Sequence, residues 1–372
     1  MYDQIKEDVL YIMLYAVVMA MAITASCYLL FRRGNAFATD VTTPLRLRRW
    51  TAAFFAAIAL NHLWYLPILF NDSSEDIIII DLTGGLLDSI TLFPLALIVF
   101  LTMLQDRRRP LWPAFAMMLP IFAMGIWSVA TNSYALLPAT YAYCLLMGIG
   151  LITYMVRALR QYGKWLCDNY ADLEHKEVWQ SFLVLAVILL VFSVYMFTDK
   201  GPVYQYSMQV ICFIIIFHLL WRVETLSDLS TTNTQSHSAE EESTALENIE
   251  NHALSPAVHN KIGELLQLHC IDTHLYLQHD LTIHQLAKAV GTNRLYLSQY
   301  FSQQGITYNA YINNLRISHF INLYNEAKAA LQPFTAQQLA HQSGYRSYST
   351  FGIAFKQRMG QTVTSWMRTN SE

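Results

Sequence analysis

The sequence predicts an all-α protein in three parts: a seven-helix transmembrane bundle over residues 1–222, a flexible acidic linker over 223–255, and an all-helical domain over 256–372 with two helix-turn-helix units. Hydrophobic residues make up 54% of the chain and charged residues only 14%, whereas a soluble globular domain usually carries about 25% charged residues. Seven apolar runs are long enough, or nearly so, to cross a bilayer. A glycine-containing motif then occurs twice in the last third of the chain.

The seven apolar runs are expected to be membrane-spanning helices. They cover residues 9–31, 50–70, 84–104, 111–130, 134–155, 178–197 and 203–221. A soluble helical core is disfavoured because these runs are apolar around the whole helix rather than on one face. A cleavable signal peptide is disfavoured because the first run follows an acidic start and precedes Arg32 and Arg33, the reverse of a signal peptide's charge order.

The charges of the loops predict the orientation of the bundle. Loops 32–49, 105–110 and 156–177 hold 12 Lys/Arg together, and the segments at the other ends of the helices hold 2. Basic loops stay in the cytoplasm, so the N-terminus is expected outside and everything after Arg222 inside.

Two ionisable residues within the apolar runs, His62 and Asp88, are candidates for sensing a ligand or a proton, because charged groups in hydrocarbon are costly and often functional. The alternative is structural: Asn61 and His62 would hydrogen-bond a neighbouring helix, and Asp88 would lie near the outer headgroups. Both interpretations stay open at this point.

Residues 223–255 form a polar strip with 7 acidic residues and no Lys or Arg. Such a segment cannot bury enough apolar surface to offset the entropy of ordering it, so a flexible tether is expected, with a reach of roughly 30 Å. The following 117 residues, 256–372, are basic, with 9 Lys/Arg against 5 acidic residues. A helix is expected to start at Ser255-Pro256, a capping serine followed by a proline.

The repeated motif lies in this basic domain. Residues 286–301 and 339–355 both begin Leu-Ala-x3-Gly, and Leu286/Leu339 and Gly291/Gly344 are each 53 residues apart. A first helix would pack its Leu-Ala face inward, the glycine would permit a tight turn, and a second helix would present polar side chains to a DNA major groove. Two such units are predicted, at about 282–303 and 335–358, with an amphipathic helix over 311–324 between them. Their repetition within one basic domain indicates a DNA-binding domain with two helix-turn-helix units.

These residues resemble the AraC/XylS family of bacterial transcription regulators, through LTIHQLAKAVGTNRLYLSQYF, YINNLRISHFINLY and SGYRSYSTFGIAFKQRMGQTVTSWMR. The resemblance implies two helix-turn-helix units that place recognition helices in successive major grooves of double-stranded DNA. The residues it places at the DNA are Arg294, Leu295, Ser298 and Gln299 in the first unit and Arg346, Ser347, Tyr348, Ser349, Thr350, Gly352 and Lys356 in the second.

The sequence departs from the family pattern at three places. Ser302-Gln303 replaces a basic pair, Ile353 replaces a frequent arginine, and Val363 replaces a proline. The first two departures remove positive charge, so low DNA affinity is expected unless two copies bind together, which makes a homodimer a candidate assembly.

The function predicted from these features is that of a membrane-bound transcription regulator in the cytoplasmic membrane of a bacterium, in contact with lipid and controlled by an unidentified signal ligand or membrane partner. Two alternatives are a transporter or channel with a regulatory domain and a membrane-anchored adaptor whose helix-turn-helix domain binds protein. An enzyme is disfavoured, because no phosphate loop, kinase signature or nucleophile–base pair is recognisable. No cofactor is expected. The five cysteines contain no CxxC pair and the histidines of the basic domain lack metal-ligand spacing, so no metal site is expected either.

Overall fold

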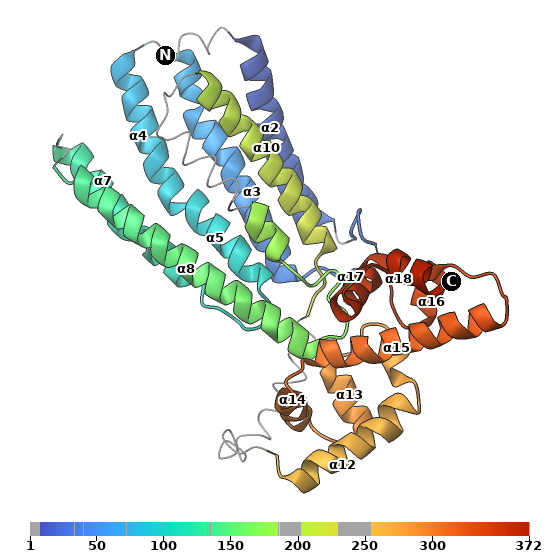
Figure 1. Ribbon diagram of the computed structural model, residues 1–372. Coiled ribbons are helices and arrows are strands. Elements are labelled where there is room, and N and C mark those ends of the chain that lie inside the picture. Colours follow the sequence, from blue (N-terminus) through green and yellow to red (C-terminus); the bar gives the residue numbers. More distant parts are fainter. Residues whose placement is uncertain are drawn as a thin grey trace. The chain divides into compact units, whose positions relative to one another are not determined.

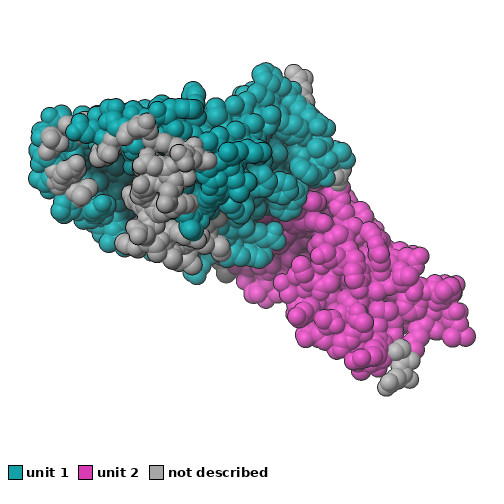
Figure 2. Space-filling model, turned by 90° about the horizontal axis from the view of Figure 1, so that it is seen from above, with its two compact units in different colours: residues 1–162, 178–231 teal, residues 163–177, 232–372 magenta. Residues whose placement is uncertain are grey.

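The computed structural model describes residues 8–371 except 33, 40, 72, 132, 134, 185, 187–201 and 230–253. Every regular element among these residues is a helix, apart from an isolated antiparallel bridge between Tyr170 and Thr282. The all-α prediction is therefore confirmed for the described part of the chain. Two compact units, coloured separately in Figure 2, comprise Met1–Tyr162 with Val178–Thr231 (unit 1) and Gly163–Glu177 with Thr232–Glu372 (unit 2).

Unit 1 consists of apolar helices, which Figure 1 shows in blue to yellow-green. In chain order these are α2 (Val9–Phe31), α3 (Leu45–Tyr65), the 3-10 turn η1 (Leu66–Phe70), α4 (Ser74–Ile90), α5 (Leu92–Met103), α6 (Trp112–Ala116), α7 (Leu119–Thr131), α8 (Leu137–Asn169) and α10 (Pro202–Thr225). α3 is central, in contact with α2, α4, α5 and α10. α8 is continuous in the chain, and its residues from Gly163 onward belong to unit 2.

Five helical stretches of unit 1 are long and apolar enough to cross a membrane. They are Val9–Phe31, Leu45–Phe70, Glu75–Met103, Pro138–Asn169 and Val203–Thr225, and Trp112–Ser128 is a shorter apolar stretch. These six overlap six of the seven predicted segments. The seventh, 178–197, lies largely outside the described residues, so the number seven stays a prediction.

The surface of these helices is itself apolar. In α8, for example, Leu145, Leu146 and Ile149 are 66%, 69% and 56% exposed. Large apolar side chains gathered on the outside of a helix are unfavourable in water. A lipid environment removes that cost, because hydrocarbon side chains then face hydrocarbon.

Unit 2 is organised around α15 (Tyr308–Ala329), which carries a group of shorter helices at each end (Figure 1). The first group contains α12 (Pro256–Leu266), the π turn η4 (Gln267–Ile271), the 3-10 turn η5 (Leu275–Leu277), α13 (Ile283–Val290) and α14 (Arg294–Gln303). The second contains α16 (Ala336–Gln342), α17 (Tyr348–Met359) and α18 (Val363–Ser371). Each group has its own apolar core, to which α15 contributes Tyr308 and Ile312 at one end and Ile317, Phe320 and Tyr324 at the other.

Polar caps define where the helices of unit 2 begin. The Ser255 side chain accepts a hydrogen bond from the Val258 N–H, as the Ser-Pro start predicts. Thr282 and Thr335 cap α13 and α16, each in a capping box with the glutamine three residues later. Because each box satisfies two otherwise unpaired backbone N–H groups, the two short helices are held at matching start points.

A segment far away in sequence completes the first group. Ala171, in the stretch that follows α8, is 1% exposed and shares the apolar core with Ile262 and Leu286. Its N–H donates to the Leu281 carbonyl at 3.0 Å, and the Asn309 side-chain amide donates to the Ala171 carbonyl at 2.6 Å. Unit 2 is therefore assembled from two separate stretches of chain.

Candidate nucleic-acid interface

The first helix pair, α13 and α14, is joined by a tight turn at Gly291, whose φ is +72°. Asn293 begins α14 by accepting a hydrogen bond from the Tyr296 N–H. Leu297 and Phe301 are buried on the inner face of α14. The inner face is thus apolar, and the outer face is free to carry polar contacts.

The four DNA residues predicted on α14 differ in exposure. Leu295 and Ser298 are exposed, and Arg294 is half-exposed at the start of the helix. Gln299 is half-buried, and its Oε1 has no hydrogen-bond partner among the described residues. This oxygen is itself buried, so the Gln299 side chain would have to rotate outward before it could contact a base.

The second helix pair, α16 and α17, has its turn at Gly344, with φ +87°. Ser347 begins α17 by accepting a hydrogen bond from the Thr350 N–H at 3.3 Å. Phe351 and Phe355 are fully buried, which orients α17 on its core in the way that Leu297 and Phe301 orient α14.

Most of the predicted residues on and before α17 gather around its N-terminal half, and Lys356 lies in its last turn. Four are exposed: Arg346, Tyr348, Ser349 and Lys356. Three are half-buried: Ser347, Thr350 and Gly352. Small polar side chains at the N-terminal half of a helix, with cations beside them, suit contacts to base edges and phosphates.

Two arginines of the second group already have partners within unit 2. Arg346 pairs with Asp280 at 3.4 Å. Arg358 donates to the Ser318 hydroxyl at 2.9 Å and to the Asn314 carbonyl, so it fastens α17 to α15. Of the two cations on α17, Lys356 is exposed and its side chain makes no hydrogen bond or ion pair among the described residues.

A buried arginine that the sequence did not single out connects the two groups. Arg316 of α15 is fully buried and donates to the carbonyls of Tyr276 at 2.8 Å and Gln278 at 2.7 Å. It also pairs with Asp172 at 3.4 Å, and its guanidinium lies 5.5 Å from the Tyr345 ring centroid. Since Ile312, Arg316 and Phe320 are four residues apart on the buried face of α15, their spacing was a signal for a buried cation.

Asp280, just before α13, forms a second connection between the first group of helices and the second. It pairs with Lys176 at 2.8 Å as well as with Arg346. Burial would raise the pKa of the Asp280 carboxyl, but Lys176 and Arg346 together lower it below its usual value. A carboxylate between two cations stays ionised at neutral pH, so Asp280 carries its charge there.

The two candidate sensing residues of unit 1 make hydrogen bonds between helices. His62 of α3 is buried, with Nε2 2.9 Å from the side-chain oxygen of Gln209 in α10. Asp88 of α4 accepts from the Asn61 amide at 2.8 Å and from the Tyr65 hydroxyl at 3.2 Å. The hydrogen bonds of Asn61 and His62 to neighbouring helices are those that the structural interpretation expects. The headgroup position of Asp88 and the sensing role of both candidates stay predictions.

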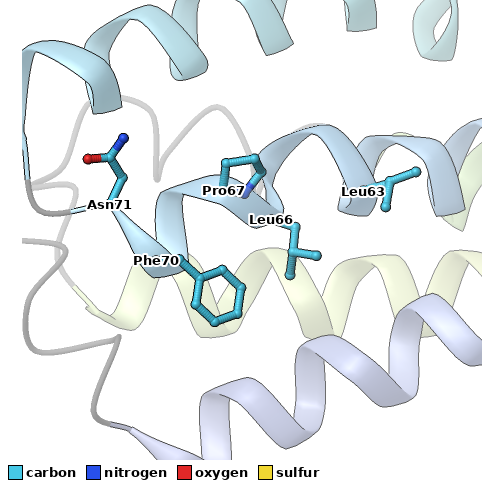
Figure 3. Close-up of a pocket in the computed structure, with 5 residues that line it drawn as sticks. All are labelled: Leu63, Leu66, Pro67, Phe70 and Asn71. Carbon is cyan, nitrogen blue, oxygen red and sulfur yellow. The ribbon is translucent and has the colours of Figure 1, made fainter.

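Figure 3 shows an open surface pocket in unit 1, lined by the end of α3 and by η1. Its lining residues are Leu63, Leu66, Pro67, Phe70 and Asn71. All five belong to one continuous stretch and all but one are apolar, so the pocket offers no set of converging polar groups. No group of His, Cys, Asp or Glu side chains among the described residues could hold a metal ion.

Comparison with known proteins bears on unit 2. A family described as "Helix-turn-helix domain" matches residues 286–369. The TCP pilus virulence regulatory proteins of two strains of Vibrio cholerae serotype O1 are 32% identical to this chain over 76 residues, which is 20% of this chain and 26% of the relatives. The matched region thus spans about a quarter of these relatives' length. No solved structure matches the chain.

Proposed function

We propose that this protein is a membrane-bound transcription regulator in which α14 and α17 are the recognition helices of two helix-turn-helix units that read double-stranded DNA. Residues 286–369 carry a helix-turn-helix domain, and the partial relatives are regulatory proteins by name. A DNA-binding regulator, rather than a member of an enzyme family, is the function these similarities support.

The observation that carries the proposal is the matched construction of the two helix pairs. Each has a glycine with positive φ between its helices, a polar N-cap on its second helix, and two buried apolar side chains on that helix. Both pairs are attached to one helix, α15. Two recognition helices on one rigid connector suit successive turns of a major groove.

The apolar helices of unit 1 support the membrane part of the proposal. The orientation with the N-terminus outside rests on the distribution of Lys and Arg among the loops. The boundaries 1–222, 223–255 and 256–372 are modified in this proposal. The tether would begin after Leu229, because α10 extends to Thr225 and Leu226 and Leu229 are buried, and residues 163–177 are grouped with 256–372. The signal would act through the helices of unit 1, with His62 and Asp88 as candidate sensing groups, and a homodimer would supply the affinity that one copy lacks.

The proposal is tested by crosslinking the full-length protein to the genome in living cells and sequencing the bound DNA. Replacing Arg294 and Lys356 by alanine should remove most enriched sites, because each side chain is assigned to the interface. The matched control replaces Lys261 and Lys328, two exposed lysines outside α14 and α17, and should leave the sites in place. A binding profile that the first pair of substitutions leaves unchanged would favour an adaptor that binds protein instead.

A further inference from the structure

The stretch formed by the last two residues of α8 and those that follow it, residues 168–177, makes a series of contacts with the helices proposed to read DNA. This stretch holds four acidic residues, Asp168, Asp172, Glu174 and Glu177, and one lysine, Lys176. It lies between two apolar segments of unit 1 in the chain, yet it belongs to unit 2. We call it the acidic segment.

The middle of the acidic segment is firmly held. Ala171 is in the core of the first group, and the Asp172 side chain, 3% exposed, pairs with the fully buried Arg316. Tyr170 forms an antiparallel bridge with Thr282, the N-cap of α13. The segment is therefore docked by apolar burial, by backbone pairing and by a buried ion pair together.

Acidic side chains on either side of this anchor interact with residues near the N-terminal ends of α14 and α17. Glu174 Oε2 accepts a hydrogen bond from the Thr350 hydroxyl at 3.1 Å. On the other side, the Asp168 carboxylate interacts electrostatically with Arg294. Thr350 and Arg294 are two of the residues assigned to DNA.

We propose that the acidic segment is an internal competitor of DNA, which occupies the DNA-facing surface of both helix pairs and must leave it before DNA can bind. The inference rests on the proposed function of α14 and α17. Carboxylates beside Arg294 and Thr350 stand where phosphates and base edges would otherwise be, and like charges repel an approaching DNA backbone. The segment is also the direct continuation of α8, so a change in that helix has a covalent route to the DNA-facing surface.

The release of the segment need not unfold unit 2. Release separates Asp172 from Arg316 and removes Ala171 from the core, so the docked state is favoured without a signal. Arg316 still keeps its two backbone carbonyl acceptors, from Tyr276 and Gln278. A signal would shift the equilibrium between the docked and the undocked segment only as far as it binds the undocked state more tightly than the docked state. A regulator built in this way is silent by default and active on release.

A disulfide that fixes the segment in place is the direct test. Tyr170 and Thr282 are a bridge pair in which the next residue, Ala171, donates to Leu281. Such a pair has its Cα atoms about 4.5 Å apart, which a disulfide can span. The full-length Tyr170→Cys/Thr282→Cys protein, with Cys167→Ser to prevent mispairing, would be placed in nanodiscs of neutral lipid and oxidised.

The probe is a pool of random-sequence duplexes, measured by fluorescence anisotropy in about 50 mM salt, where phosphate contacts are strongest. The oxidised protein should bind at least about tenfold more weakly than the same sample after reduction. Equal affinity in the two states, with the disulfide verified by mass spectrometry, overturns the proposal. Failure of the cysteines to crosslink overturns the docked arrangement itself. If neither state binds DNA, the proposed function fails, which is a separate result.

A second arm removes one competing contact without a crosslink. Glu174→Ala should tighten binding to the same duplexes by about threefold to tenfold, since a hydrogen bond to a charged group is lost from the docked state. Glu264→Ala removes the same charge from an exposed position on α12 and should leave the affinity unchanged. Equal tightening by both substitutions would mean that only net charge matters and that the segment does not compete.

Discussion

Gly291 and Gly344 stand at the same place in the two helix pairs, but their surroundings differ. Both have positive φ, so a side chain at either position strains the backbone by roughly 1–2 kcal/mol. A Cβ added at Gly291 would meet open space, whereas at Gly344 it would lie 2.8 Å from the Cα and carbonyl oxygen of Leu277. Backbone atoms cannot move aside as a flexible side chain can.

Gly344→Ala is therefore expected to destabilise unit 2 by clearly more than Gly291→Ala, which should cost only the backbone strain. Amide hydrogen exchange of the full-length protein, followed on peptides from α13 and α16, measures the difference. Equal loss of protection in the two variants would mean that η5 and the turn at Gly344 are not in close contact.

Arg316 is the other residue whose role is set by burial. Arg316→Ala removes a fully buried guanidinium and leaves the Asp172 carboxylate, 3% exposed, without its cation. Breaking a buried pair in this way typically costs about 3–5 kcal/mol. Hydrogen exchange of α13 and α15 should rise steeply, while Lys261→Ala, at an exposed lysine of α12, should change it little. A mild effect of Arg316→Ala would show that the two ends of α15 are held by their separate apolar cores alone.

The recognition helices are expected to divide their work. Lys356 of α17 is exposed and is assigned to phosphate, and Gln299 lies half-buried on α14 with a buried side-chain oxygen that would have to rotate outward to reach a base. In DNA-binding assays on the full-length protein, Lys356→Ala should weaken all sequences alike and flatten the salt dependence by about one phosphate contact. Gln299→Ala should relax the preference at one or two base positions, worth about 1–3 kcal/mol each, and leave the salt dependence nearly unchanged.

Arg358→Ala serves as the control for this prediction, because its guanidinium is directed to α15. It should not alter the salt dependence. If Gln299→Ala changes neither preference nor affinity, the base-reading positions of α14 must be shifted along the helix.

At the level of elements, local patterns predicted most of unit 2. The Leu-Ala-x3-Gly repeat gave both inward faces and both positive-φ glycines, and Ser255-Pro256 marked the start of α12. The connecting helix was expected at 311–324 and extends over Tyr308–Ala329, because the Thr307 cap and the polar residues after Tyr324 carry no apolar signal. The residues that determine these turns and helix ends lie within a few positions of them in the sequence.

The acidic segment could not be predicted in this way. Its partners are remote: Lys176 and Asp280 are 104 residues apart, and Asp172 and Arg316 are 144 apart. Alone, the segment has the composition of an ordinary loop between two helices. Only folding brings its carboxylates to α15 and α17. Local periodicity carries no information on such contacts, so it could not predict the role of the segment.

For the whole molecule, the orientation in the membrane is the central prediction. A reporter that fluoresces only in the cytoplasm should be bright when fused after Arg222 and dark when fused after Ser74. The reason is the excess of Lys and Arg in the loops that include 32–49 and 156–177. The opposite pattern would remove unit 2 from the compartment that holds DNA and would contradict the proposed function.

Because unit 2 is built from two separate stretches of chain, the number of membrane crossings between those stretches is restricted. Residues 163–177 and α12 to α18 pack into one unit, so both stretches must be on the same side of any membrane that the chain crosses. An even number of crossings therefore separates Glu177 from Pro256. If α10 crosses the membrane, one further crossing is needed in this interval, and the apolar run 178–197 is the one that the sequence predicts. This argument does not use the charges of the loops. It nevertheless places residues 163–177 and unit 2 on one side of the membrane, as the loop charges also predict.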